Sequence, residues 1–310
     1  MNKATWTTKV HWGSRALTVV AMGALLVACS DDGDSDAGDG DASMRTLSMS
    51  YQGLPALGDG FVYEGWLIVD GAPVSTGRFT VDAAGALSPS TFELDAAVAD
   101  AGTTFILTIE PAVGDDPAPA DTHVLAGDMS NGESVLTIDH TAALGDDFTA
   151  AAGTFILATP SSADMTDDNQ GIWFLDPSSG EMMPSLELPT LPAGWVYEGW
   201  VVDVSSGEPM PLSTGTFTDV ATADSDQGGA TAGPEGTPPF PGQDYISPAR
   251  DLTQNHMAVI SIEPMPDDSP APFQLKPLAS MIGSEVGGMN AQTIANAIGE
   301  NTIGGSVKFE

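Results

Sequence analysis

The sequence predicts an all-β protein built from two tandem antiparallel β-sandwich-like domains. Three observations support this fold class: a set of motifs that occurs twice, short aromatic and β-branched runs, and turn residues between those runs. The 310-residue chain contains 35 Gly and 23 Pro but just 8 Lys and Arg. This composition favours short strands and turns over long helices, and the length suits two ordinary domains.

Three motifs recur in the same order along the chain. They are LPALGDGFVYEGW at 54–66 and LPTLPAGWVYEGW at 188–200, VSTGRFT at 74–80 and LSTGTFT at 212–218, and Ile-Glu-Pro at 109–111 and 262–264. Motifs repeated in a fixed order indicate a duplicated unit, so we name the two occurrences the first copy and the second copy. We expect a first β-domain over 45–160, a connecting segment with a strand over 161–187, a second β-domain over 188–284 and a tail over 285–310.

Within the first copy, aromatic and β-branched residues over 62–69 predict a strand. Asp70-Gly71 then predicts a tight turn into a partner strand over 76–81. The near-continuous apolar run over 103–109, closed by Pro111, predicts a buried central strand.

Two similar apolar runs, 153–158 and 172–175, lie between the copies. They either complete the first domain or pair with the second. A short C-terminal helix is expected over 290–298, because Gly299 follows as a capping signal.

The N-terminus has the pattern of a lipoprotein signal peptide over 1–28. Lys3, Lys9 and Arg15 precede an apolar run at 16–28 that is too short to span a bilayer. The run ends in Leu-Val-Ala-Cys29, which resembles a lipobox. A plain secretory signal is the alternative, but Cys29 is the chain's sole cysteine and stands where the lipobox requires it. We therefore expect an exported protein anchored in membrane lipid through acylated Cys29.

Ser30 after the cysteine resembles the outer-membrane sorting pattern of Gram-negative lipoproteins. The following residues, 29–44, are rich in Asp and Gly. Counted from Asp32 they fail as a calcium loop, because Ala37 and Ser43 stand where Gly and Glu are required. A flexible, self-repelling tether is expected instead.

Charge excludes several classes of partner. The net charge is −35, and removal of Lys3, Lys9 and Arg15 with the signal peptide takes it to −38. Such a surface repels nucleic acid and anionic headgroups, so no nucleic-acid partner is expected. With one cysteine there can be no intramolecular disulfide, and the fold must depend on its core.

The repeated unit resembles the extracytoplasmic C-terminal domain of anti-sigma-K-type regulators. The resemblance rests on Val62-Tyr-x-x-Trp66, on the hairpin sequence GAPVSTGRFT over 71–80, and on Ile109-Glu-Pro111 followed by a Pro-rich loop. It covers about residues 54–127 and, with a longer hairpin insertion, 188–280. It implies an exported β-module that senses or binds something.

The sequence also departs from those regulators. They carry a cytoplasmic zinc-binding domain and a transmembrane helix, whereas this sequence has no second cysteine for such a zinc site and no spanning helix. We therefore do not expect the sigma-binding function to carry over.

The duplicated acids are the first candidates for chemistry: Glu64 and Glu198 in the Tyr-Glu-Gly-Trp motif, and Glu110 and Glu263 before proline. A carboxylate pair can act as acid and base or bind a cation. The favoured interpretation is structural: these side chains hydrogen-bond to loop backbone and fix strand ends.

Other polar and aromatic residues give weaker signals. The sequence spaces no histidines as zinc ligands, and Ser75 and Ser213 lack a nucleophile-elbow motif. His123, His140 and His256 are therefore expected at the surface or at strand edges. Tyr63, Trp66, Tyr197 and Trp200 either line a sugar-stacking face or enter the core, and burial of Trp66 is favoured. Paired aspartates in several loops, among them Asp146-Asp147 and Asp267-Asp268, form an acidic surface or bind calcium loosely.

The sequence thus predicts no catalytic residue, cofactor or metal ligand. We expect a membrane-anchored, non-enzymatic envelope lipoprotein that acts as a binding, sensing or accessory module, with an unknown envelope protein or glycan as partner. Two alternatives stay open: an envelope-glycan hydrolase that uses Glu64 or Glu198, and a structural spacer.

Overall fold

The structure is a computed structural model that describes residues 43–244, 249–267 and 269–310. The expected signal peptide, Cys29 and nearly all of the tether therefore lie outside the described residues. Residues 42–310 form one compact unit. Its elements are strands in several antiparallel sheets with three short helices, which confirms the all-β prediction.

The first copy forms a five-stranded sheet in the order β4-β3-β2-β6-β7. Its strands are β2 (Phe61–Val69), β3 (Ala72–Val81), β4 (Leu87–Ser88), β6 (Gly102–Pro111) and β7 (His123–Asp128). Asp70 and Gly71 join β2 to β3 with φ angles of 50° and 77°, the left-handed conformation of a tight hairpin turn. The predicted hairpin is confirmed as the pair β2–β3. The predicted buried strand is confirmed as β6, which lies between β2 and β7.

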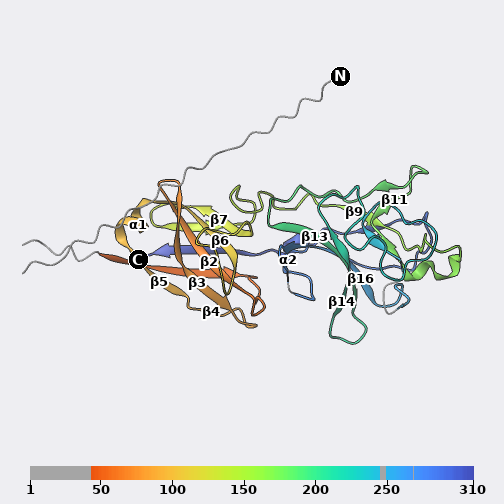
Figure 1. Cartoon of the computed structure of the whole chain (residues 1–310), viewed down its shortest axis with the longest axis horizontal. Coiled ribbons are helices and arrows are strands. Elements are labelled where there is room, and N and C mark those ends of the chain that lie inside the picture. The colour runs from red at the N-terminus through yellow and green to blue at the C-terminus, as the bar shows by residue number, and fades with distance from the viewer. Residues whose placement is uncertain (1–42, 245–248, 268) are drawn as a thin grey trace, which may run out of the picture. The chain divides into compact units, whose positions relative to one another are not determined.

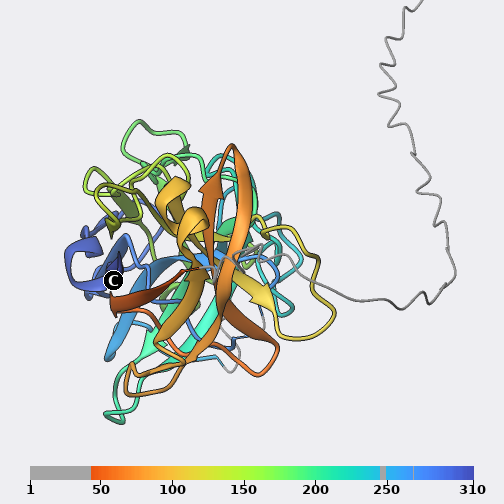
Figure 2. The ribbon, with the colours of Figure 1, turned by 90° about the vertical axis from the view of Figure 1, so that its left-hand side faces the viewer.

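A second sheet faces the first and has the order β5-β1-β19-β8. Its strands are β1 (Met44–Gln52), β5 (Thr91–Asp95), β8 (Glu133–Leu136) and β19 (Gly304–Phe309), and helix α1 (Ala96–Ala101) follows β5. Leu47 and Val307 from this sheet share one buried cluster with Tyr63 and Leu107 from the other. Figure 2 shows the first copy from its own side of the molecule, with its strands coloured red to yellow except β19, which is blue.

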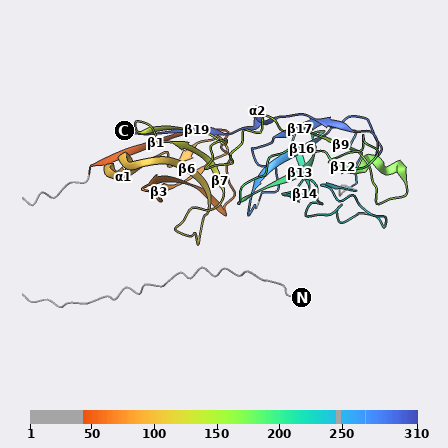
Figure 3. The ribbon, with the colours of Figure 1, turned by 90° about the horizontal axis from the view of Figure 1, so that it is seen from above.

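The prediction that residues 285–310 form a C-terminal tail is wrong. Its last residues form β19, which pairs with both β1 and β8 (Figure 3). The physical reason is alternation: Val307 and Phe309 are buried while Ser306 and Lys308 are exposed, so one face of the strand enters the core. A close approach also requires Gly305, because a Cβ there would lie 2.4 Å from the Tyr51 ring.

The second copy forms a four-stranded sheet in the order β14-β13-β16-β17. Its strands are β13 (Trp195–Asp203), β14 (Met210–Phe217), β16 (His256–Pro264) and β17 (Leu278–Met281). The two copies share their pairing: a register shift follows Gly65 in β2 and Gly199 in β13, and Tyr63 faces Ile109 as Tyr197 faces Ile262.

Three two-stranded sheets complete the described fold. They are β9 (Gly153–Phe155) with β18 (Gln292–Ile294), β10 (Ile172–Trp173) with β15 (Gly242–Gln243), and β11 (Leu175–Asp176) with β12 (Met183–Pro184); the 3₁₀ helix η1 (Met165–Gln170) precedes β10. The runs at 153–158 and 172–175 thus pair with strands later in the chain (green and blue in Figure 1), so the expected boundary at residue 160 is wrong.

The expected helix over 290–298 is also wrong. Residues 292–294 form β18, and the helix α2 (Ile298–Asn301) begins where the prediction ends. β-branched Thr293 and Ile294 pair with β9, and the amide of Asn296 donates to the carbonyl of Phe148 at 2.8 Å. These long-range hydrogen bonds outweigh the local helix propensity of the alanine-rich segment.

Candidate functional site

Glu64 lies in the middle of β2, with 5% of its surface exposed. The hydroxyl of Ser75 on β3 donates to its carboxylate, and Nε of Arg78 lies 3.4 Å from the other carboxylate oxygen. Arg78 also lies 3.6 Å from Asp115 and donates to the carbonyl of Pro111. The Glu64 side chain is therefore part of a hydrogen-bonded ionic cluster on the hairpin.

Glu110 lies at the end of β6 and is fully buried. Its carboxylate accepts hydrogen bonds from the Thr108 hydroxyl and from the backbone N–H of Ala120, the latter at 2.8 Å. Thr108 in turn accepts from the indole N–H of Trp66 at 2.9 Å. Burial raises the pKa of Glu110, and the negative charges of Asp115 and Glu64 raise it further. Glu110 thus ties the Pro-rich loop to the end of its strand.

The second copy repeats this arrangement. The Ser213 hydroxyl donates to Glu198, and the Ser261 hydroxyl donates to Glu263 while accepting from the indole N–H of Trp200 at 2.7 Å. Burial raises the pKa of Glu198, and it raises the pKa of Glu263 to about 7. Thr108 in the first copy and Ser261 in the second therefore make the same two hydrogen bonds, one from a tryptophan and one to a glutamate.

The copies differ in the cation beside the acids. Thr216 occupies the position opposite Glu198 that Arg78 occupies opposite Glu64. In the second copy Lys276 interacts electrostatically with Glu263: burial lowers the pKa of Lys276, and the charge of Glu263 raises it. The Lys276 amine donates to the carbonyl of Phe273 at 2.7 Å.

These contacts favour the structural interpretation of the four acids. Glycoside hydrolysis needs two carboxyl groups that both reach the scissile bond. Glu64 and Glu198 are 5% and 8% exposed, and each accepts from a serine of the neighbouring strand. The cavity described below is lined by other residues.

The repeated aromatic residues enter the core. Tyr63 and Tyr197 are buried, and their hydroxyls donate to the carbonyls of Pro55 and Pro189 at 2.9 and 2.7 Å. Trp66 and Trp200 are also buried, and their indole N–H groups donate to Thr108 and Ser261. The predicted burial of Trp66 is confirmed. No sugar-stacking face is formed by these four described residues.

The histidines are placed differently from one another. The His140 side chain lies outside the strands and is partly exposed, with Nε2 3.4 Å from Asp128. His123 is the first residue of β7, the last strand of its sheet, and its Nδ1 lies 2.7 Å from the carbonyl of Ala142. His256 begins β16 and is 4% exposed, so its expected surface or edge position is wrong. Its Nε2 lies 3.8 Å from Asp203, to which it is opposed across the sheet.

The loop aspartates mostly cap turns. Asp146 and Asp267 accept the backbone N–H two residues later, at 2.6 and 2.8 Å, as in Asx turns. Asp224 is buried and accepts three backbone N–H groups, while burial raises its pKa to about 6. In the described ranges, no three His, Cys, Asp or Glu side chains gather as metal ligands would. Helices in those ranges are also too short or too polar to cross a bilayer.

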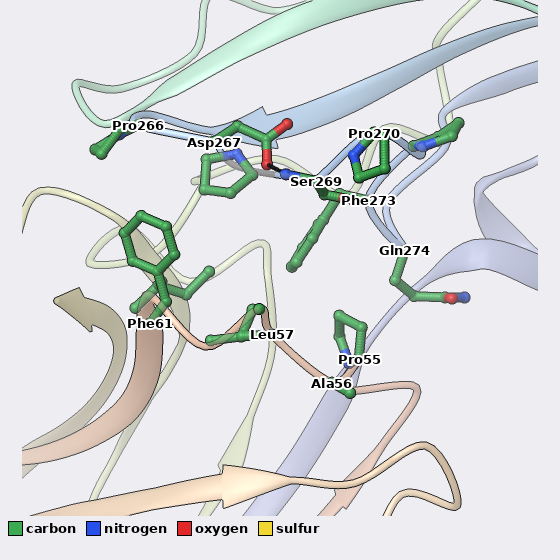
Figure 4. A pocket seen from close by; sticks show the side chains of 14 residues that line it. Pro55, Ala56, Leu57, Phe61, Pro266, Asp267, Ser269, Pro270, Phe273 and Gln274 are labelled. Carbon is green, nitrogen blue, oxygen red and sulfur yellow. Dashed lines mark hydrogen bonds between the residues drawn. The ribbon is translucent and has the colours of Figure 1, made fainter. Parts of the chain in front are cut away.

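A cavity of about 310 Å³ lies where loops of the two copies meet. The first copy contributes the motif segment 55–58 with Phe61 and Ile109, and the second contributes residues between Pro264 and Gln274. Figure 4 shows the Phe273 ring pointing into this space, with Leu57 and Phe61 opposite. Most of the lining is proline, phenylalanine or aliphatic carbon, so the cavity is suited to an apolar group.

The buried acid of the second copy positions this wall. The backbone N–H of Phe273 donates to both oxygens of Glu263, at 2.9 and 3.1 Å, and the Phe273 ring packs against Trp195 at a centroid distance of 5.9 Å. The sequence showed Ile-Glu-Pro as a repeated motif but not that the following loop lines a cavity. The proline pattern Pro270-Ala-Pro272 was the available signal.

Residues 21–124, about a third of the chain, match the family described as anti-sigma-K factor RskA, C-terminal. The match covers most of the first copy's sheet and ends inside β7. It agrees with the resemblance derived from the motifs. The matched family is a non-enzymatic regulatory or accessory module. Neither the curated proteins nor the solved structures contain a match to this chain.

Proposed function

We propose that this protein is an exported lipoprotein whose β-unit binds a component of the bacterial envelope and acts as a non-enzymatic sensing or accessory module. The observation that carries the binding role is the cavity between the two copies. Loops at strand ends form it, and recognition residues in β-proteins are commonly carried on such loops.

The lining restricts the ligand. Pro55, Pro270 and Phe273 offer apolar surface, and Asp267 adds an acidic group at the wall. A neutral or cationic partner is favoured, since the chain's net charge of −35 repels anions. A short segment of an envelope protein meets these conditions, as does the apolar face of a glycan ring.

The anchor is the second part of the proposal. The lipobox residues at 26–29 supply the site of acylation, and Ser30 supports sorting to the outer membrane. With the anchor at Cys29, residues 30–42 give the folded unit a tether to the membrane surface. Ligands of the cavity would then be envelope components within reach of that tether.

The test is photo-crosslinking in intact cells of the source bacterium. A photoreactive phenylalanine analogue placed at Phe61, which lines the cavity, is expected to capture a defined envelope component that mass spectrometry can identify. The control places the same analogue at Val113, a 91% exposed loop residue outside the lining. Equal capture at both positions, or none at Phe61 in a folded protein, would contradict the proposal.

A further inference from the structure

The large apolar side chains exposed on this protein are almost all of one kind. Ten large hydrophobic residues are exposed in the described part of the chain, and all but Val113 and Val135 are methionine. No described Leu, Ile, Phe, Tyr or Trp side chain is exposed to the same degree. Scattered apolar residues are common on protein surfaces, but their restriction to the thioether side chain is particular to this chain. The eight exposed methionines are Met44, Met165, Met182, Met183, Met210, Met265, Met281 and Met289, with exposed fractions between 46% and 76%.

The core has the opposite composition. Within the described residues, Met49 is the one methionine among the buried members of the main core cluster, and it is 9% exposed. Leucine, isoleucine, valine and aromatic residues supply most of the rest of that cluster. Oxidation of methionine converts an apolar side chain into a polar sulfoxide, which disrupts a packed core. A core that depends so little on thioethers is therefore insensitive to oxidation of the methionines at the surface.

The places of the exposed methionines in the fold also tolerate a larger, polar side chain. Met44, Met165 and Met210 are the first residues of β1, η1 and β14, and Met281 is the last residue of β17. Met265 follows the last residue of β16. Since these side chains stand at the ends of elements and are exposed, an oxygen atom added to the sulfur meets solvent rather than a packed neighbour.

Other side chains that oxidants attack are shielded. Trp66, Trp173, Trp195 and Trp200 are at most 4% exposed. The sole cysteine is Cys29, the expected lipidation site, and acylation there leaves the protein without a free thiol. An oxidant that reaches the described surface therefore meets thioethers before it meets indole rings.

We propose that the eight exposed methionines are oxidation sites at which this protein consumes two-electron oxidants of the hypochlorous acid and hydrogen peroxide class. A lone pair of the methionine sulfur attacks the oxygen of the oxidant. A sulfur–oxygen bond forms while the O–Cl or O–O bond breaks, and chloride with a proton, or water, leaves. The sulfur loses two electrons and becomes a sulfoxide, which methionine sulfoxide reductases return to the thioether. None of the eight methionines lines the cavity of the proposed function, so these sites are separate from its binding role.

The test uses residues 29–310 with Cys29→Ser, so that no thiol competes for the oxidant. Hypochlorous acid is added in steps, and intact-mass spectrometry and peptide mapping follow the uptake of oxygen atoms. The exposed methionines are expected to react about tenfold faster than Met49. Protein oxidised at these sites should keep the urea midpoint of the untreated protein. Sulfoxide reductases of both epimer specificities should then restore the original mass.

Leucine substitutions test whether the exposed sites protect the rest of the protein. A variant with leucine at all eight positions keeps the side-chain volumes but removes the sites. It is expected to unfold at a several-fold lower dose of oxidant, because that dose then reaches Met49 and the buried tryptophans. The double variant Met182→Leu and Met183→Leu tests the same point with two neighbouring changes and should take up two oxygen atoms fewer than the parent protein.

Met49→Leu is the matched control, because it removes a buried thioether and leaves all eight exposed ones in place. It should take up as much oxygen as the parent protein and unfold at the same dose. Three results would overturn the proposal: oxidation of Met49 as fast as the exposed methionines, a lower urea midpoint after oxidation of the exposed methionines alone, or equal resistance of the eightfold leucine variant and the parent protein.

Discussion

The backbone N–H of Phe273 donates to both carboxylate oxygens of Glu263, so a buried acid at a strand end holds one wall of the cavity between the copies. Glu110 holds the equivalent loop of the first copy through Ala120. In both copies the repeated Ile-Glu-Pro motif therefore marks the place where a strand fixes its loop. The acid in this motif is positioned for structure, and its ionisation is linked to folding.

Glu263→Gln is expected to remove a pH-dependent loss of stability. The pKa of Glu263 is about 7 in the folded protein, against an ordinary value of 4.5. Since the folded pKa is the higher one, the stabilisation from this group is complete below about pH 4.5 and is lost as pH rises through about 7. The glutamine side chain of the variant still accepts the Phe273 N–H but cannot ionise. Urea unfolding should give similar stability for both proteins at pH 5 and an advantage of about 3 kcal/mol for the variant at pH 8.

The control for this prediction is Glu310→Gln, because the Glu310 side chain is 65% exposed. Its stability difference from the wild type should stay within about 0.5 kcal/mol at both pH values. A Glu263→Gln advantage of the same size at pH 5 and pH 8 would show that the effect does not come from ionisation.

Thr108→Val is expected to destabilise the protein by about 1–3 kcal/mol, measured by urea unfolding. The hydroxyl of Thr108 accepts from Trp66 and donates to Glu110, and all three residues are buried. Valine keeps the shape of threonine but leaves a buried indole N–H and a buried carboxylate without this partner.

Thr108→Ser is the matched control, because Ser261 performs both roles in the second copy. It keeps the hydroxyl and removes one methyl group, so its cost should be clearly smaller than that of the valine variant. Equal losses from valine and serine would mean that the packing of the methyl group, and not the hydrogen bonds, decides the stability of this site.

Local sequence signals predicted the elements whose partners are close in the chain. Asp70-Gly71 and the aromatic residues on either side of it predicted the β2–β3 hairpin, and the apolar run before Pro111 predicted β6. Tyr63 and Trp66 could be assigned to the core because strand alternation and the size of these side chains favour burial.

The partners of distant segments could not be predicted in the same way. Periodicity tells which face of a strand is buried but not which strand it pairs with. The alternation of Val307 and Phe309 identifies a strand, yet its pairing with β1 joins residues more than 250 positions apart. For the same reason the cavity was missed: Phe61 and Phe273 lie in different copies, and each looks like an ordinary loop or strand-end residue on its own.

The return of the C-terminal strand gives a further prediction. Val307→Ala should cost about 2 kcal/mol in unfolding free energy, because the Val307 side chain is 1% exposed in the core of the first copy. Amide hydrogen exchange should increase in β1, which pairs with β19. Lys308→Ala alters the opposite, exposed face and should have little effect, since its contact with Glu310 is a surface ion pair. An unchanged exchange rate in β1 on Val307→Ala would contradict the role of β19.

The lipid anchor is tested by intact-mass spectrometry of membrane-extracted protein, with the wild type compared with Cys29→Ser. We expect the wild-type mass to correspond to a chain that begins at Cys29 and carries acyl chains, and we expect the variant to lack the acyl chains. Because Cys29 is the sole cysteine, no other thiol can take the lipid. A soluble wild-type protein without acyl mass would remove the membrane anchor and leave a free protein, and the ligands of the cavity would then no longer be restricted to the reach of a tether.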